Sequence, residues 1–176
     1  MDTTTALAFV LSENSHDKIN EIRSKHDKAY PRWMPHINFI FPFVKSDKFD
    51  EVCDKLKNLK TKSFNVVLDT INYFPQQDIC TVHMKPSKKS CERLATLFNE
   101  IMSILSDVSV KHKEFHPHAT IGQFTKDTID EQIKILKEWL NIGFVMKCDR
   151  ICILQRDPNG DDQMKIVREI GLSTLD

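Results

Sequence analysis

The sequence predicts an α+β fold made of two similar halves. Segments with strand-like and helix-like periodicity alternate along its 176 residues, and the same alternation occurs in both halves. Each half also contains an apolar strand that begins with Pro-His. Only four glycines and seven prolines interrupt the chain, so no long flexible linker separates the halves. We therefore expect one bilobal domain that covers residues 1–176.

The spacing of apolar residues locates each element. Alternating or continuous apolar runs predict strands, whereas apolar residues three and four positions apart predict helices. In chain order, the expected strands are Thr5–Leu11, His36–Val44, Ser63–Phe74, Asp78–Lys85, His118–Phe124, Gly143–Cys148 and Ile151–Leu154. The expected helices are one capped by Ser15, one capped by Ser46 or Asp47, Ser87–Ser106 and Thr128–Leu140. A turn over residues 157–161 precedes the last segment, Met164–Ile170.

Charge and hydropathy exclude several classes of protein. With 25 basic and 25 acidic residues, the chain lacks the basic excess of proteins that coat long nucleic acids, which leaves only local binding of one or two phosphates. No run of about 18 apolar residues predicts a membrane span, and the first ten residues lack the features of a secretory signal. Five cysteines without a CxxC pair favour free thiols in a reducing compartment, so we expect a cytoplasmic protein, with the nucleus as the alternative.

Two histidines occur in matched surroundings about 80 residues apart. Residues 35–39 read PHINF, and residues 117–121 read PHATI. Because residues i and i+2 of a strand point to the same face, His36 shares a face with Asn38, and His118 shares one with Thr120. A polar pair on an otherwise apolar strand is costly unless it is hydrogen-bonded or wet. Its occurrence in both halves predicts two strands that face one polar groove.

Two imidazoles across a groove suit general acid–base chemistry. An unperturbed histidine titrates near pH 6.5, so one ring can act as base while the other acts as acid near neutrality. The neighbouring polar groups, Asn38 and Thr120, can donate hydrogen bonds to phosphoryl oxygens as negative charge develops there. This chemistry requires no metal ion and no cofactor. It fits the cleavage of phosphodiesters of the ribonuclease type.

The two motifs resemble those of the two-histidine (2H) phosphoesterases, which include 2′-5′ RNA ligase and cyclic phosphodiesterase proteins. That family carries two His-x-Thr/Ser-x motifs, each on a central strand of one lobe, and residues 32–43, 64–75 and 115–124 are similar to its motif strands and their neighbours. The resemblance implies two antiparallel sheets with outer helices, a central groove, pseudo-twofold symmetry and an exchange of strands between halves. It also implies that His36 and His118 are catalytic and that Asn38 and Thr120 bind phosphate. Asn38 departs from the pattern, since Thr or Ser is expected there.

Further residues are candidates for substrate binding, each with a plainer alternative. Arg32 precedes the first motif and either approaches a phosphate or is a solvated surface residue. Phe74 either forms a wall for a stacked base or belongs to the core. Lys85, Lys88 and Lys89 form either a solvated helix start or a patch that steers an oligonucleotide.

The remaining histidines raise the question of a metal site. His112, His116 and His118 lie close together in the sequence, but Pro117 interrupts them, so we expect no metal. Surface positions are expected for the other three: His16, His26 and His83.

The sequence therefore predicts a monomeric, metal-independent phosphodiesterase that acts on a short RNA or nucleotide, with 2′,3′-cyclic phosphates or 2′-5′-linked oligonucleotides as substrates. The alternative is a non-catalytic nucleotide- or RNA-binding module that uses the same groove. The departure at Asn38 motivates that alternative.

Overall fold

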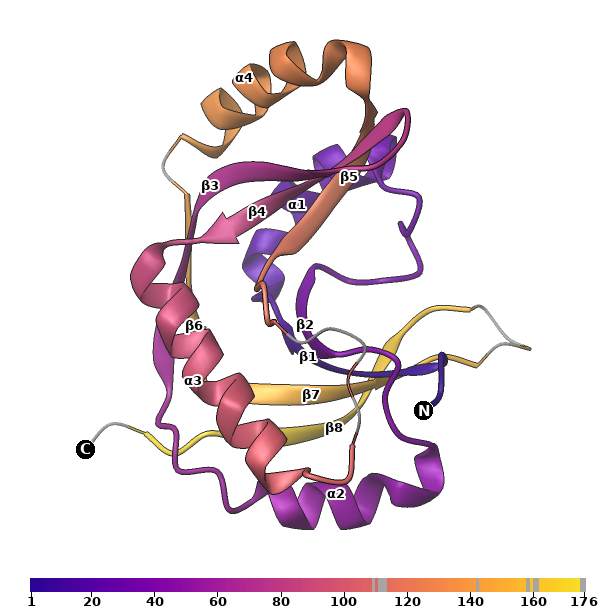
Figure 1. Cartoon of the computed structure of the whole chain (residues 1–176), viewed down its shortest axis with the longest axis vertical. Coiled ribbons are helices and arrows are strands. Elements are labelled where there is room, and N and C mark those ends of the chain that lie inside the picture. Colours follow the sequence, from indigo (N-terminus) through magenta and orange to yellow (C-terminus); the bar gives the residue numbers. More distant parts are fainter. Residues whose placement is uncertain (109, 111–113, 142, 158, 160–161, 175–176) are drawn as a thin grey trace.

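A computed structural model describes residues 1–108, 110, 114–141, 143–157, 159 and 162–174, and within them it contains two four-stranded antiparallel sheets (Figure 1). The first sheet has the strand order β2 (His36–Ile40), β1 (Thr5–Val10), β7 (Arg150–Gln155) and β8 (Lys165–Gly171). The second has the order β5 (Ala119–Thr125), β4 (Ile79–Pro86), β3 (Phe64–Pro75) and β6 (Phe144–Cys148). The predicted α+β fold with two antiparallel sheets is confirmed.

Four helices cover these sheets in the described part of the chain. They are α1 (Glu13–His26), α2 (Phe49–Leu56), α3 (Lys88–Ile104) and α4 (Ile129–Leu140). Helices α1 and α4 pack on the second sheet, and α2 packs near β8 (Figure 1). Helix α3 contacts β3 and β4 of the second sheet and also α2. Gly122 of β5 allows the close approach of α1, because a Cβ at this position would lie 2.6 Å from the Cβ of His26.

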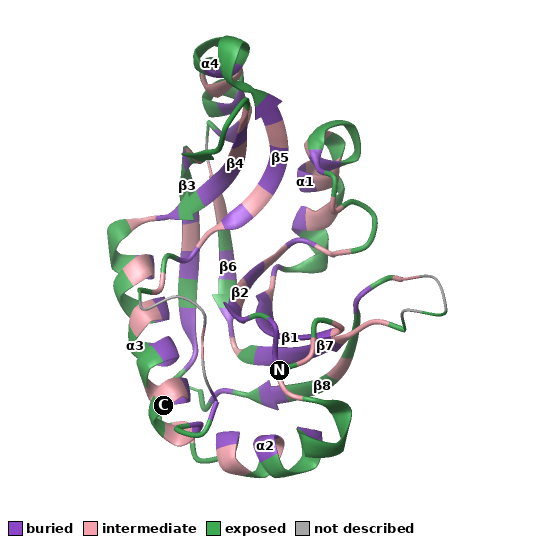
Figure 2. Ribbon diagram, turned by 45° about the vertical axis from the view of Figure 1, so that its right-hand side comes forward, coloured by how far each residue is buried: buried purple, intermediate pink, exposed green. Residues whose placement is uncertain are grey.

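Each sheet is completed by strands from the other half of the chain. Strand β3 belongs to the first half but lies between β4 and β6, whereas β7 and β8 belong to the second half but extend the sheet of β1 and β2. The expected strand exchange is therefore present. The exchanged strands also contribute to the buried core, chiefly through residues of β3 and β7 such as Val66, Leu68, Ile151 and Ile153 (Figure 2).

The order of elements repeats along the chain. The series β1-α1-β2-α2 is matched by β4-α3-β5-α4, and a short 3₁₀ turn precedes both α2 (Ser46–Lys48) and α4 (Lys126–Thr128). The two motif strands, β2 and β5, each occupy an edge of their sheet rather than the central position that the resemblance implied, and they contact each other. This repeat brings the two motif strands together from opposite sheets, as pseudo-twofold symmetry requires.

Several predicted boundaries are wrong by a few residues. Ser15 does not cap α1; it is buried in the first turn and donates to the Ser12 carbonyl at 2.6 Å, with Ser12 in the cap position. Strand β2 ends at Ile40 rather than Val44, because Pro42 has no N–H to donate to a ladder. Ser46 and Asp47 begin the 3₁₀ turn, so α2 starts only at Phe49.

The longest predicted helix, Ser87–Ser106, is present as α3 but ends at Ile104, and Ser87 is its cap, where it accepts a hydrogen bond from the Ser90 N–H. All five cysteines are free thiols, and burial raises the pKa of Cys148 to about 12. Residues 158, 160 and 161 of the expected turn lie outside the described residues. No helix among the described residues is long and apolar enough to cross a membrane.

Candidate active site

His36 and His118 are held in the same way by the backbone. Nδ1 of His36 lies 2.6 Å from the carbonyl oxygen of Met34, and Nδ1 of His118 lies 2.7 Å from that of His116. Each carbonyl comes from the residue two positions earlier, and both Met34 and His116 precede their strands, β2 and β5. Because a carbonyl only accepts, Nδ1 carries the proton in both neutral rings, and Nε2 keeps the lone pair. Both histidines are therefore oriented for proton transfer through Nε2.

Burial disfavours the charged form of both rings. It lowers the pKa of His36 to about 4, an effect that the Met34 carbonyl opposes and the charge of His118 reinforces. Burial also lowers the pKa of His118, against the opposing effect of the His116 carbonyl. The charge of Arg23 lowers the pKa of His36 more than that of His118 does, whereas the charge of Asp27 raises it.

The two polar partners differ between the halves. At the first motif, the Asn38 amide donates to Nε2 of His36 at 3.0 Å, so it occupies the lone pair of that ring. The Asn38 Oδ1 atom is buried and has no hydrogen-bond partner in the described part of the chain. At the second motif, Thr120 is half-buried on β5 and lies opposite His83 of β4 in the ladder.

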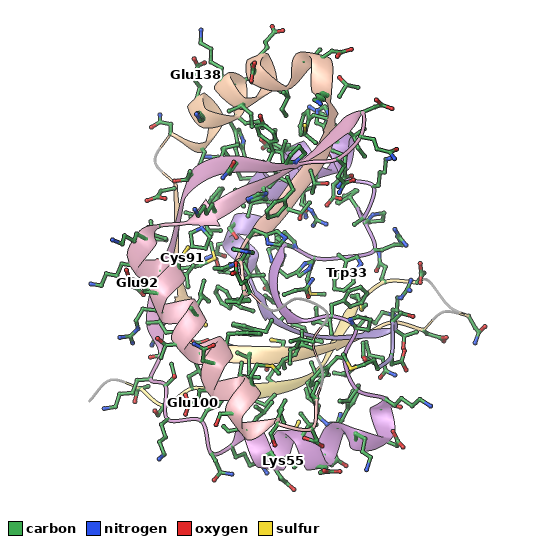
Figure 3. All side chains as sticks on the ribbon, in the orientation of Figure 1. Trp33, Lys55, Cys91, Glu92, Glu100 and Glu138 are labelled. Carbon is green, nitrogen blue, oxygen red and sulfur yellow. The ribbon has the colours of Figure 1, made fainter. Side chains whose placement is uncertain are left out.

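An aromatic ring contacts each histidine. Trp33, labelled in Figure 3, lies on the segment before β2. Its ring stacks on that of His36 with the ring centroids 4.7 Å apart. Phe74, near the end of β3, meets His118 edge to face at 5.0 Å and is 38% exposed. These rings restrict the imidazole orientations that the backbone carbonyls set.

His83 is a site residue that the sequence reasoning missed, and its expected surface position is wrong. It is only 3% exposed, stacks on Phe74 at 4.3 Å and meets His118 edge to face at 5.1 Å. Burial lowers the pKa of His83 to about 4, and the charges of His118 and Lys85 reinforce the effect. One signal was available: polar Thr81, His83 and Lys85 alternate with buried residues along β4, as a groove-facing strand requires.

Two cavities lie on the side of the second motif, with His118 lining the smaller one and His83 lining the larger one. The smaller, of about 590 Å³, lies between the sheets, since residues of both β2 and the β3–β4–β5 sheet line it. Its lining includes Asn38, Phe41, Phe74, Thr81 and His118. The larger, of about 850 Å³, is lined by β3, β4 and the first turns of α3, where Cys91 and Glu92 lie (Figure 3). Phe74 lines both cavities and therefore stands at their boundary.

The remaining candidates are placed differently. Arg32 has a side chain 45% exposed, lies 3.6 Å from an oxygen of Asp162 and donates to the Lys28 carbonyl, and neither contact reaches the histidines. Lys85 and Lys88 line the larger cavity. His116 is exposed and faces Glu114 at 3.3 Å. His112 lies outside the described residues, and among the described residues no group of three or more His, Cys, Asp or Glu is placed to hold a metal ion.

Two histidines, each anchored by a backbone carbonyl at or just before the start of an edge strand, form the arrangement that the resemblance to the two-histidine phosphoesterases implies. The comparison with protein families gives the same result: the chain belongs to the 2′-5′ RNA ligase superfamily, whose family model matches residues 11–160. No curated protein matches the chain.

Solved structures with the same fold have little sequence in common with this chain. The apo form of E. coli LigT has a TM-score of 0.66 and 14% identity, with 97% of each chain covered. TT0787 of Thermus thermophilus has a TM-score of 0.60 and 14% identity, covering 98% of this chain and 99% of that one. Usb1 of Kluyveromyces marxianus has a TM-score of 0.50 and 10% identity, over 96% of this chain and 97% of that one. LigT has also been crystallised with phosphate and with 3′-AMP.

Proposed function

We propose that this protein is a metal-independent phosphodiesterase that cleaves RNA-type phosphodiesters, either 2′,3′-cyclic phosphates or 2′-5′ linkages. The observation that carries the proposal is the identical anchoring of His36 and His118, which leaves Nε2 of each ring free of the backbone. Two imidazoles in one tautomer, on strands that contact each other, supply a base and an acid for one displacement at phosphorus. Membership of the superfamily and the phosphate-bound crystals of LigT support the choice of a phosphate ester.

The two histidines take different roles in this mechanism. His36, with its pKa lowered to about 4, is neutral at pH 7 and is assigned as general base. Its Nε2 accepts the proton of water or of a ribose hydroxyl, and the oxygen of that nucleophile forms the new bond to phosphorus. The bond to the leaving oxygen breaks as His118 Nε2, in its protonated form, donates a proton to that oxygen. The nucleophile thus loses a proton and the leaving group gains one.

The phosphoryl oxygens are bound by the polar partners of the histidines. Thr120 donates its hydroxyl hydrogen, and Asn38 donates an amide hydrogen after its bond to His36 is exchanged for one to phosphate. Phe74 provides an aromatic face beside His118 for the nucleoside that carries the phosphate. Arg32 remains a predicted phosphate contact that requires release of Asp162.

The test is a panel of nucleoside 2′,3′-cyclic phosphates and 2′-5′-linked dinucleotides, assayed with and without a chelator. We expect turnover that the chelator leaves unchanged and that falls by roughly 10²- to 10⁴-fold in His36→Ala and in His118→Ala. The matched control is His26→Ala, which removes an exposed histidine outside the site. Full activity in His118→Ala, or complete inhibition by the chelator, would contradict the mechanism.

A second function is favoured by one observation. The Asn38 amide occupies the lone pair through which His36 would accept a proton, so the groove as it stands is suited to binding phosphate without turnover. In that case the protein is a nucleotide- or RNA-binding module of the cytoplasm. Binding of the same dinucleotides without any cleavage across the panel would select this function.

A further inference from the structure

The larger cavity has the size and the position of a nucleoside subsite. Its volume of about 850 Å³ lies within the range of roughly 300 to 1,000 Å³ of small-molecule sites. Asn72 and Phe74 of β3, with His83 and Lys85 of β4, form its wall nearest to His118. The contacts of Phe74 and His83 with the His118 ring place this wall next to the proposed acid.

His83 is held less firmly by the backbone than the two motif histidines. Its Nδ1 atom is buried and makes no hydrogen bond of good geometry in the described part of the chain. The Thr81 carbonyl, two residues earlier, still interacts with the ring as a hydrogen-bond acceptor and raises its pKa against the effect of burial. In His36 and His118 the corresponding carbonyl oxygen lies 2.6 and 2.7 Å from Nδ1.

The fold does not require a histidine at this position. His83 of β4 lies opposite Thr120 in the second sheet, and Ala8 of β1 lies opposite Asn38 in the first. Ala8 is fully buried and apolar. The same place in the repeat is therefore filled by a small apolar residue in one half, so packing alone does not account for an imidazole in the other.

The charges of the cavity favour an uncharged ligand over a second phosphate. Lys85 and Lys88 line it together with Asp69 and Glu92, so the formal charges cancel. Burial lowers the pKa of His83 to about 4, which keeps this ring neutral at pH 7. Aromatic rings with neutral donors and acceptors suit a planar group with polar edges, as a nucleobase has.

We propose that this cavity binds the base of a nucleoside attached to the scissile phosphate, with Phe74 as its aromatic wall and His83 and Asn72 as hydrogen-bonding partners of the base edge. The inference rests on the proposed function and adds to it a base subsite on one side of the phosphate. Discrimination between bases would come from one face of the groove, that of β3 and β4.

The test uses three 2′-5′ dinucleotides: one with both bases, and two that are abasic on one side or the other. In His83→Phe, which keeps a stacking ring but removes both nitrogens, we expect KM to rise about 5- to 20-fold, as loss of one hydrogen bond predicts. On one of the two abasic substrates, KM of the variant should equal that of the wild type. The value of kcat and the limbs of the plot of kcat/KM against pH should stay unchanged. Asn72→Ala, at an exposed position opposite His83, should show the same substrate pattern without a risk to folding.

Two results would overturn the base subsite. One is an equal fall in kcat on all three substrates with displaced pH limbs, because His83 would then act through His118. The other is no change in either variant on any substrate. If the wild type cleaves none of the dinucleotides, the proposed function fails, and the subsite is tested separately by equilibrium binding of the three compounds. The same pattern across variants is then expected in Kd, and absence of any base-dependent binding would refute it.

Discussion

Acid stability provides a direct measure of the burial of His83. Its folded pKa of about 4 lies below the ordinary value of 6.5, so the unfolded chain binds a proton more readily in this range. Stability is therefore present above pH 6.5 and is lost as the pH falls from there through 4. Between about pH 7 and about pH 4.5, this difference lowers the free energy of unfolding by roughly 2 kcal/mol. The substitution His83→Phe removes that titration, so the free energy of unfolding of the variant should fall by about 2 kcal/mol less than that of the wild type over the same interval.

The assay is urea unfolding at both pH values, followed by the fluorescence of Trp33 and Trp139. Only the difference between the two pH values is compared, so a change in baseline stability from the substitution cancels, as does the titration of His36. The control is His26→Phe, which removes an exposed histidine that stacks on Phe124 at 4.4 Å and should leave the difference at its wild-type value. If His83→Phe loses as much stability as the wild type, the charged form of His83 is not disfavoured, and the argument for a neutral ring in the cavity fails.

Two further predictions concern catalysis. The plot of kcat/KM against pH should be bell-shaped with its maximum below pH 6.5, because burial lowers the pKa of both His36 and His118. In the plot of kcat against pH, both limbs should lie at higher pH, because bound phosphate favours the imidazolium. A rate that rises to a plateau with pH would instead indicate a single base. The substitution Asn38→Thr restores the family motif and frees the lone pair on Nε2 of His36. On the best substrate of the panel, kcat should therefore increase by about 10-fold, while the pH profile stays bell-shaped. A loss of activity would instead make the Asn38 amide an essential donor.

The motif strands and the α+β class were predictable because alternation of polar and apolar residues reports directly which face of a strand is buried. His36 with Asn38, and His118 with Thr120, followed from that pattern. The strand exchange came from the family resemblance, since periodicity does not specify which strands pair. His83 was missed because its burial depends on Phe74 and His118, which belong to two other strands. Arg32 likewise faces Asp162, a pairing that no local pattern reports.

The two halves of the site differ in a way that corresponds to the asymmetry of the reaction at phosphorus. A phosphodiester is itself asymmetric, because the nucleophile enters on one side of phosphorus and the leaving oxygen departs on the other. The repeat supplies the shared requirement, a histidine fixed by a carbonyl two residues earlier on each edge strand. The differences lie beside it: an amide on His36 in one half, and a neutral second imidazole against His118 in the other. A groove with identical halves would bind a diester equally well in both orientations. We therefore expect Asn38 and His83, which differ from their counterparts Thr120 and Ala8 in the other half, to set the preferred orientation of the substrate.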